Sequence, residues 1–272
     1  MVPESILSEV VTCATQAVGS TKPAKTIFEN DDFTVELIDS IEYLKEALSI
    51  MREGFYPDES ICKGVRLGED LSASDVKFPA DPAQVRLSGV QGVKELEALT
   101  LETAKDGISL VAIDKRTGKV AGAAFNKIQR ALGDGEKGFF ESFRDSHCKS
   151  ISAIALIDSM IEVDSRFDVI EHYKVKCALE VMFLATRPEF RKRGVGVLLM
   201  WGAFEAAKIR GIPLVVALMT SIFTQKIGRK VGMDELSEVK NEELSFLGEP
   251  LPVIQGLHKS TILMTKKIST SN

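Results

Sequence analysis

The spacing of apolar residues predicts an opening that alternates strands and helices. FTVELI, residues 33–38, alternates apolar and polar side chains as a half-buried strand does, and IEYLKEALSIMREGF, residues 41–55, repeats them at helical spacing. A second helical pattern, VKELEALTLETAKDG, ends at Gly107. ISLVAID and VAGAAFNKI, joined by KRTGK, predict a hairpin in which Gly118 supplies the positive φ of the turn.

The second half of the chain predicts a strand, a loop, a helix and a strand in succession. Residues 139–173 have a helical pattern, in which FFESFRDSH and SAIALIDSMI could be separate pieces. CALEVMFLAT, residues 177–186, predicts a buried strand. RPEF connects this strand to the loop RKRGVG, residues 191–196, and from Val197 to about Gly211 the apolar side chains lie on one helical face. IPLVVALMT predicts a second buried strand, TQKIGRKVG a short helix and HKSTILMTKKI a late strand. This order indicates an α/β protein with a mixed sheet.

Domain organisation is simple. Residues 1–27 hold a weakly amphipathic stretch and the linker-like GSTKPAK, so we expect a tail of uncertain order followed by one domain over residues 28–272. The longest apolar runs fall short of the about 18 residues that span a bilayer, and the N-terminus lacks the pattern of a signal peptide. We therefore expect a soluble protein with no membrane partner.

Composition narrows the partners. The chain carries 34 Lys and Arg against 39 Asp and Glu, a net charge of −5, which argues against binding to nucleic acid. The cysteines stand far apart with no CxxC pair, and the histidines lack the spacing of metal ligands, so we predict no metal site and no disulfide framework. A cytoplasmic monomer fits these features. The cysteines are Cys13, Cys62, Cys148 and Cys177, and the histidines are His147, His172 and His258.

The loop RKRGVG lies where a strand leads into a helix. The first N–H groups of a helix have no internal partner and carry partial positive charge, so they attract anions. Gly194 and Gly196 open access to this backbone, and the cations before them raise the local potential. We expect a phosphate site here. The nucleoside-triphosphate motif GxxxxGK[ST] is absent, and Leu199 stands where the dinucleotide motif GxGxxG has its last glycine.

RKRGVG matches the R/Q-x-x-G-x-G/A signature of the GCN5-related N-acetyltransferases (GNATs), in which this loop binds the pyrophosphate of acetyl-CoA. The lead-in LATRPEFR also resembles that family. Two further segments, YPDESI and LMTSIFTQKIGRKVGM, resemble insect arylalkylamine N-acetyltransferases, and the likeness covers most of residues 28–268. The resemblance implies the GNAT fold, which is a mixed, mostly antiparallel central sheet, splayed at the cofactor strands and flanked by helices. It also implies acetyl-CoA as co-substrate.

The same resemblance implies a set of cofactor-binding residues. Pantetheine would lie along the strand and bond to the main chain of Leu184 and Thr186, while N–H groups around Leu184 and Ala185 would stabilise the oxyanion. The diphosphate would occupy the loop and the first helical turn, and Ser221 would contribute from the next loop. The loop residues are Arg191, Lys192, Arg193, Gly194, Val195, Gly196 and Val197.

The resemblance also implies a catalytic base. An alkylamine has a pKa of about 10.4, so roughly one molecule in a thousand is the free nucleophile at neutral pH. Glu59, in the acidic loop, corresponds to the base of the family, and Asp58 beside it would attract a cationic substrate. The alternative is that both residues form a solvated turn after Pro57. Ser60 departs from the subfamily, which more often has proline directly after the glutamate.

Hydroxyl groups after the second buried strand complete the expected site. The insect enzymes carry two serines there, and Thr220 and Thr224 occupy the matching positions, where they are candidates for catalysis or substrate ordering. Helix N-capping by Thr220 or Ser221 is an equally good interpretation. Phe223 stands where many acetyltransferases have a tyrosine that acts as general acid, and phenylalanine cannot donate a proton. His172 is a further, weaker candidate for an acid or base.

The sequence therefore predicts transfer of an acetyl group from acetyl-CoA to a primary amine by direct attack. The subfamily points to an arylalkylamine of the dopamine, serotonin or tyramine type. The alternatives are an agmatine or polyamine acetyltransferase, an enzyme that uses longer acyl-CoAs, and an acyl-CoA-binding protein with little turnover. The last stays open because of the residues at positions 220, 223 and 224.

Overall fold

The computed structural model describes residues 2–18, 25–72, 74–75, 87–133 and 135–269. The helices are α1 (Glu4–Val18), α2 (Ile41–Gly54), α3 (Ser60–Gly64), α4 (Gly89–Ala104), α5 (Phe139–His147), α6 (Ile151–Ser165), α7 (Val169–Tyr173), α8 (Val195–Ile209) and α9 (Ile222–Lys230). Two short 3₁₀ turns, η1 (Pro188–Phe190) and η2 (Asn241–Glu243), complete the helical elements of these residues.

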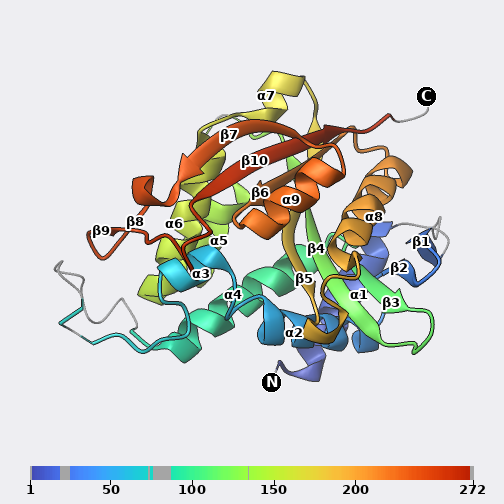
Figure 1. Cartoon of the computed structure of the whole chain (residues 1–272), viewed down its shortest axis with the longest axis horizontal. Coiled ribbons are helices and arrows are strands. Elements are labelled where there is room, and N and C mark those ends of the chain that lie inside the picture. Colours follow the sequence, from blue (N-terminus) through green and yellow to red (C-terminus); the bar gives the residue numbers. More distant parts are fainter. Residues whose placement is uncertain (1, 19–24, 73, 76–86, 134, 270–272) are drawn as a thin grey trace.

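One eight-stranded sheet organises the molecule, in the order β1-β2-β3-β4-β5-β6-β10-β7 (Figure 1). Neighbouring strands run antiparallel except β5 and β6, which are parallel. β8 and β9 form a separate small hairpin. The strands are β1 (Thr26–Glu29), β2 (Phe33–Leu37), β3 (Leu110–Asp114), β4 (Val120–Arg130), β5 (Cys177–Thr186), β6 (Leu214–Met219), β7 (Asp234–Lys240), β8 (Ser245–Phe246), β9 (Glu249–Pro250) and β10 (Ser260–Lys267).

Helices cover both faces of the sheet (Figure 1). Alternate residues of β3 show the two cores, because Leu110 packs with the side chains of α8 while Val111 packs with those of α2, α4 and α6. Both side chains are fully buried. The protein is thus of the α/β class, with a mixed sheet between two helical layers, as the sequence predicted.

The N-terminal residues are more ordered than the sequence suggested. We expected a tail of uncertain order over residues 1–27, but residues 4–18 form α1, which buries Leu7, Val10 and Ala14 and packs against α2 and α4. Gly107 permits this packing, since a Cβ there would lie 2.2 Å from the carbonyl oxygen of Ala14. Most of the expected linker lies outside the described residues. One domain over residues 28–272 stays a prediction.

Most predicted elements are present with small shifts at their ends. The strand over residues 177–186 and the hairpin with Gly118 at positive φ are confirmed. α8 begins at Val195, two residues before the predicted start, and α4 begins four residues early. The sequence missed β1, β7 and α3, because β7 has a mostly polar, half-exposed pattern and α3 has five residues.

Candidate active site

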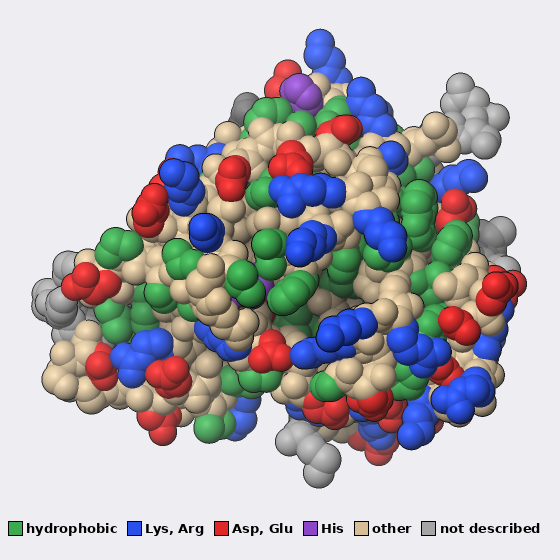
Figure 2. Space-filling model, viewed as in Figure 1, with side chains coloured by type: hydrophobic (Ala, Val, Ile, Leu, Met, Phe, Trp, Pro, Cys, Tyr) green, Lys and Arg blue, Asp and Glu red, His purple; other side chains and the backbone are tan. Residues whose placement is uncertain are grey.

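A cleft opens where β5 and β6 part. The two strands pair at Leu179 with Val215 and at Glu180 with Val216, and they diverge beyond these two pairs. Figure 2 shows this face hollowed between α9 and β5, with hydrophobic side chains inside and Lys and Arg side chains on both sides. The polar lining comprises Glu59, Glu180, Thr220 and Thr224. The apolar lining comes from β5 and β6 on one side and from α4, α5 and α6 on the other, and the helices contribute Leu96, Leu99, Phe140, Leu156, Ile157 and Met160.

A bulge in β5 sets which side chains face the cleft. Phe125 of β4 pairs with Phe183, whereas the next residue of β4 pairs with Val181, so Met182 is the extra residue. The bulge changes the face that each side chain occupies. Val181 packs in the core beside α8, and Phe183 packs in the core beside α2 and α4. The strand is therefore remodelled at the point where the sheet opens.

The main chain of β5 offers hydrogen-bonding groups to the cleft. The N–H of Arg187 donates to the carbonyl of Ala121 on β4 (2.9 Å), and backbone direction alternates along a strand. The main-chain groups of Leu184 and Thr186 therefore point away from β4, toward the cleft. Ala185 pairs with Ala123, so its N–H points to β4. The main-chain groups of Leu184 and Thr186 are therefore free to bond to a ligand, while those of Ala185 face the other edge, and the predicted contacts with pantetheine stay a prediction.

The first turn of α8 presents free backbone donors beside the cleft, since a Cβ on Gly196 would lie 3.9 Å from Cδ2 of Leu184, which lines the cleft. Gly194 precedes the helix at φ +83°, a left-handed conformation that favours glycine, and no side chain caps the helix. The first intrahelical bond runs from the N–H of Leu198 to the carbonyl of Gly194. In the part of the chain that the structure describes, the N–H groups of Val195, Gly196 and Val197 have no acceptor. These donors fit an anion.

The two glycines of the loop have different tasks. A Cβ on Gly194 would meet no atom within 4 Å, so this position needs glycine for its backbone conformation and leaves the helix start open. A Cβ on Gly196 would lie 2.7 Å from Cδ1 of Ile227 on α9. Gly196 therefore lets α9 pack closely on α8, which is a packing role that the sequence did not suggest.

The three cations of the loop point in different directions. Arg191 bonds across the cleft mouth to Asp58 (3.2 Å). Arg193 donates to the buried carboxylate of Asp114 (2.9 Å), and its guanidinium lies 4.7 Å from the ring centre of Phe33. Lys192 is exposed and has no ion-pair partner among the described residues. The side chain of Arg193 is thus engaged in the fold, which leaves Arg191 and Lys192 for a ligand.

Glu59 lies in the cleft at the start of α3. Its side chain caps the helix, because Oε2 accepts from the N–H of Cys62 (2.6 Å), and Oε1 lies 3.2 Å from the hydroxyl of Ser60. The capping fixes the direction of the carboxylate. Each oxygen keeps a further lone pair for a substrate proton. Glu59 thus caps α3 and lines the cleft, and its role as a base stays a prediction.

Hydroxyl groups at the start of α9 satisfy the helix itself. Ser221 is the N-cap and accepts from the N–H of Thr224 (3.2 Å), while the Thr224 hydroxyl donates to the carbonyl of Ser221 (2.9 Å). The capping interpretation is confirmed for Ser221. Thr220 and Thr224 nevertheless line the cleft, whereas Phe223 is 59% exposed. The catalytic role of the two threonines stays a prediction.

Known structures share this architecture. No family model matches the chain. The chain is similar to arylalkylamine N-acetyltransferase 2 from Aedes aegypti at 23% identity and a TM-score of 0.69, over 88% of this chain and 100% of that one. It is also similar to the polyamine N-acetyltransferase of Drosophila melanogaster at 15% identity and a TM-score of 0.63, over 87% and 100%.

The chain has the GNAT fold. A mosquito arylalkylamine N-acetyltransferase-like protein 5b shares it at 19% identity, with a TM-score of 0.65 over 87% of this chain and all of that one. At such low identity, the structural similarity establishes the arrangement of the sheet and helices alone. The parting of β5 and β6, the bulge in β5 and the uncapped start of α8 lie within this arrangement.

Within this GNAT fold, Glu180 is a cleft residue that sequence reasoning missed. The side chain is 5% exposed, Oε2 accepts from Nε2 of Gln129 (2.6 Å), and Oε1 has no hydrogen-bond partner among the described residues. Burial, reinforced by Asp164 and opposed by the bond from Gln129, raises the pKa of Glu180 to about 8. A charged residue inside an otherwise apolar strand was the sequence signal, because buried carboxylates are rare unless they have a function.

His258 is a second residue whose place the sequence did not indicate. Its Nδ1 accepts from the N–H of Ile222 on the first turn of α9 (3.2 Å), so the ring must be neutral at that atom. Burial lowers the pKa of His258, which agrees with an accepting nitrogen; nearby Glu59 opposes this effect and Lys63 adds to it. The ring also contacts Phe223. His258 thus completes the satisfied start of α9.

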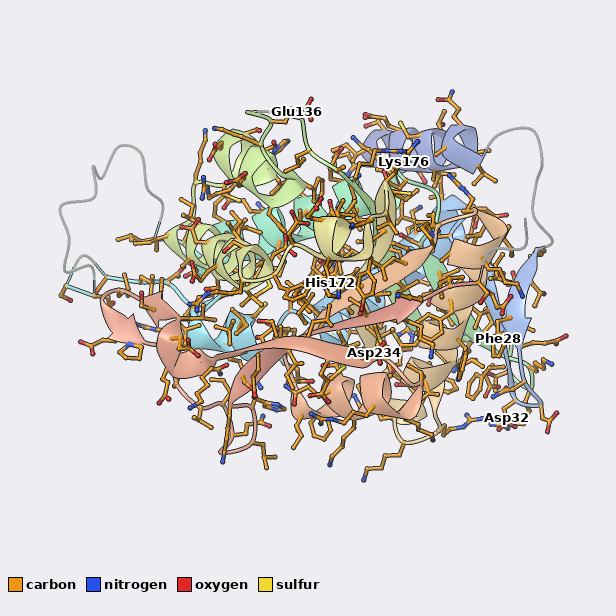
Figure 3. All side chains as sticks on the ribbon, turned by 90° about the horizontal axis from the view of Figure 1, so that it is seen from above. Phe28, Asp32, Glu136, His172, Lys176 and Asp234 are labelled. Carbon is orange, nitrogen blue, oxygen red and sulfur yellow. The ribbon has the colours of Figure 1, made fainter. Side chains whose placement is uncertain are left out.

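Other candidates lie away from the cleft. His172 is on α7, over β10 and β7, where its ring contacts Phe167 and Tyr173 (Figure 3). Within the described residues no group of three or more His, Cys, Asp and Glu could hold a metal ion, and the four cysteines are free thiols. No helix among them is long and apolar enough to cross a membrane.

Proposed function

We propose that this protein is an N-acetyltransferase that moves the acetyl group of acetyl-CoA to a primary amine. The observation that carries the proposal is the cleft between β5 and β6, which is lined by the carboxyl groups of Glu59 and Glu180 and, at Leu184, adjoins the first turn of α8 with its free N–H groups. An anion site and a base in one cleft are what this reaction needs. The similarity to solved N-acetyltransferases supports it.

The residues of the cleft suit coenzyme A. The first turn of α8, with Arg191 and Lys192, would hold the diphosphate. The main chain of Leu184 and Thr186 would bond to pantetheine as a neighbouring strand does, and the Leu184 N–H would stabilise negative charge on the thioester oxygen. Acetyl-CoA supplies an activated acetyl group, so no covalent acyl-enzyme is needed.

Glu59 would act as the base. Because the amine is almost wholly protonated at neutral pH, a carboxylate within hydrogen-bonding range or one water away must take its proton. Glu59 lines the cleft and is fixed by the N–H of Cys62. Removing a well-placed base typically costs about a hundredfold to ten thousandfold in rate.

An arylalkylamine is the acceptor that the cleft walls favour. Leucine, isoleucine, methionine and phenylalanine side chains of α4, α5, α6 and β5 form much of the inner lining, and such a surface suits an aromatic ring. A long polar cation such as agmatine would leave these groups against a charged chain. The runner-up is an agmatine or polyamine acetyltransferase, and it is supported by Glu180, which offers a second carboxyl group inside the cleft.

A thiol-release assay tests the proposal. Acetyl-CoA is incubated with the purified protein and with tyramine, tryptamine, agmatine or spermidine, and free CoA is measured. We expect release with the two aromatic amines to exceed release with the two polycations by about tenfold or more in kcat/KM. Preference for agmatine or spermidine would favour the runner-up. Binding of acetyl-CoA by calorimetry without release for any amine would indicate a binding protein, and hexanoyl-CoA in place of acetyl-CoA tests longer acyl chains.

A further inference from the structure

The residues on either side of Glu59 reach across the cleft mouth to different strands. Asp58 bonds to Arg191, which follows β5, and the Ser60 hydroxyl donates to the carbonyl oxygen of Thr220, which follows β6 (2.5 Å). The Asp58 pair is about half exposed, so it is weak and readily exchanged for water or a ligand. Ser60 is 1% exposed. Its bond is therefore the firmer of the two.

A single hydroxyl proton serves this contact. The Oγ of Ser60 also lies 3.2 Å from Oε1 of Glu59, but the shorter bond to Thr220 takes the proton. Glu59 in turn is fixed by the N–H of Cys62 inside α3. The direction of the Glu59 carboxylate thus depends on where α3 lies, and the Ser60 bond fixes α3 to the end of β6.

The local backbone does not require a serine at this position. Glu59 is already the N-cap of α3, so Ser60 is the first helical residue, a position that proline also fills well. Glu59 has φ −64° and ψ 139°, which is the conformation that a residue before proline adopts. A buried hydroxyl costs free energy unless it is bonded. The bond to Thr220 is what makes serine favourable here.

We propose that Ser60 is a positioning residue, whose hydroxyl sets the distance between the Glu59 carboxylate and the end of β6. The inference rests on the proposed acetyl transfer, in which the base on α3 must meet an amine that attacks a thioester held beside β5 and β6. An error of about 1 Å in such a geometry can cost a hundredfold in rate. The hydroxyl would thus act on the chemical step through Glu59, with little effect on cofactor binding.

Two variants remove the hydroxyl in different ways. Ser60→Ala leaves the backbone as it is, and Ser60→Pro replaces the bond by a residue that stiffens the first turn of α3. We expect both to lower kcat about tenfold while the KM for acetyl-CoA stays within about twofold. Ser60→Pro is expected to melt no lower than Ser60→Ala, so a loss of kcat in the proline variant cannot be ascribed to a looser fold.

Ser109→Ala is the matched control. Ser109 is also buried, and its hydroxyl accepts from the N–H of Asn126 on β4 (3.1 Å), away from the cleft lining. We expect this variant to lose stability and to keep kcat within about twofold. Wild-type kcat in both Ser60 variants, or an equal loss of kcat in Ser109→Ala, would overturn the positioning role.

A second readout does not depend on turnover. Hydrogen exchange is measured at the amides of residues 61–64 in the unliganded wild type, in Ser60→Ala and in Ser109→Ala. We expect faster exchange at these amides only in the Ser60 variant. Unchanged exchange there would refute the contact even if the protein transfers acetyl groups. Conversely, if the wild type transfers acetyl to no amine while exchange is still faster in Ser60→Ala, the proposed function is refuted and the contact stands.

Discussion

Two helices begin at the cleft, and their first turns differ. α8 follows β5 through a glycine loop, and its first N–H groups have no side-chain cap. α9 follows β6, and its first turn is satisfied by Ser221, by Thr224 and by His258. The dipoles of both helices favour an anion at their N-termini, but only a helix start with free donors binds one well. On the proposed function, the start of α8 would bind the anion and the starts of α3 and α9 would border the reacting groups, and we call these the anion-binding end and the reaction end.

The largest expected effect belongs to the reaction end. Glu59→Gln should lower kcat about a hundredfold or more at pH 7, because glutamine cannot take the proton of the amine. The loss should shrink at high pH, where more of the amine is already free. Steady-state kinetics from pH 7 to 10 measure this effect, and calorimetry should give an unchanged Kd for acetyl-CoA. Weaker binding of acetyl-CoA with normal turnover would contradict the assignment of Glu59 to the reaction end.

Glu180 should give the next largest effect, on stability. Its pKa is raised from 4.5 to about 8, mainly by burial, so the folded state holds this proton more tightly than the unfolded state does. The stability that Glu180 contributes is complete below about pH 4.5 and is lost as the pH rises to about 8. Thermal unfolding should be measured at pH 5, 7 and 9. The melting temperature of Glu180→Gln should rise relative to that of the wild type as the pH increases to about 8. Glu42→Gln, at an exposed position on α2, is the control for the loss of one carboxyl group.

A smaller effect is expected at the anion-binding end. Gly194→Ala forces a side chain into the left-handed region, which costs about 1–2 kcal/mol, or disturbs the first turn of α8. Either outcome should weaken acetyl-CoA binding about tenfold by calorimetry. Gly118→Ala is the matched control, because Gly118, in the hairpin between β3 and β4, also has positive φ, and a Cβ there would meet no atom within 4 Å. An equal loss of affinity in Gly194→Ala and Gly118→Ala would contradict an anion site at the start of α8.

The smallest expected effect distinguishes two neighbouring arginines. Arg191→Ala should weaken acetyl-CoA binding about fivefold, with less effect at high salt, because exposed charge contacts are worth up to about 1 kcal/mol. Arg193→Ala should leave the affinity for acetyl-CoA nearly unchanged. It should lower the melting temperature, because the buried carboxylate of Asp114 loses its ion-pair partner. Calorimetry at two salt concentrations and thermal unfolding measure both. The opposite pattern would reverse the assignment of these cations.

The sequence predicted most of the sheet, because its central strands are continuous apolar runs and α8 has a clear apolar face. It also indicated the α8 start, since Gly194 is a local signal. It missed Glu180, because the role of one carboxylate depends on the bulge at Met182 and on the layer that covers it. The contact between Ser60 and Thr220 joins residues far apart in the chain, and no local pattern marks such a pair.

Where β5 and β6 part, the sheet has a line of weakness. In the described residues the two halves, β1 to β5 and β6 with β10 and β7, are joined within the sheet by two residue pairs, so helices carry much of the remaining connection. Partial opening along this line should need less free energy than global unfolding, and a protease should find it first. A ligand that binds both β5 and β6 should stabilise the closed sheet and slow cleavage by a protease.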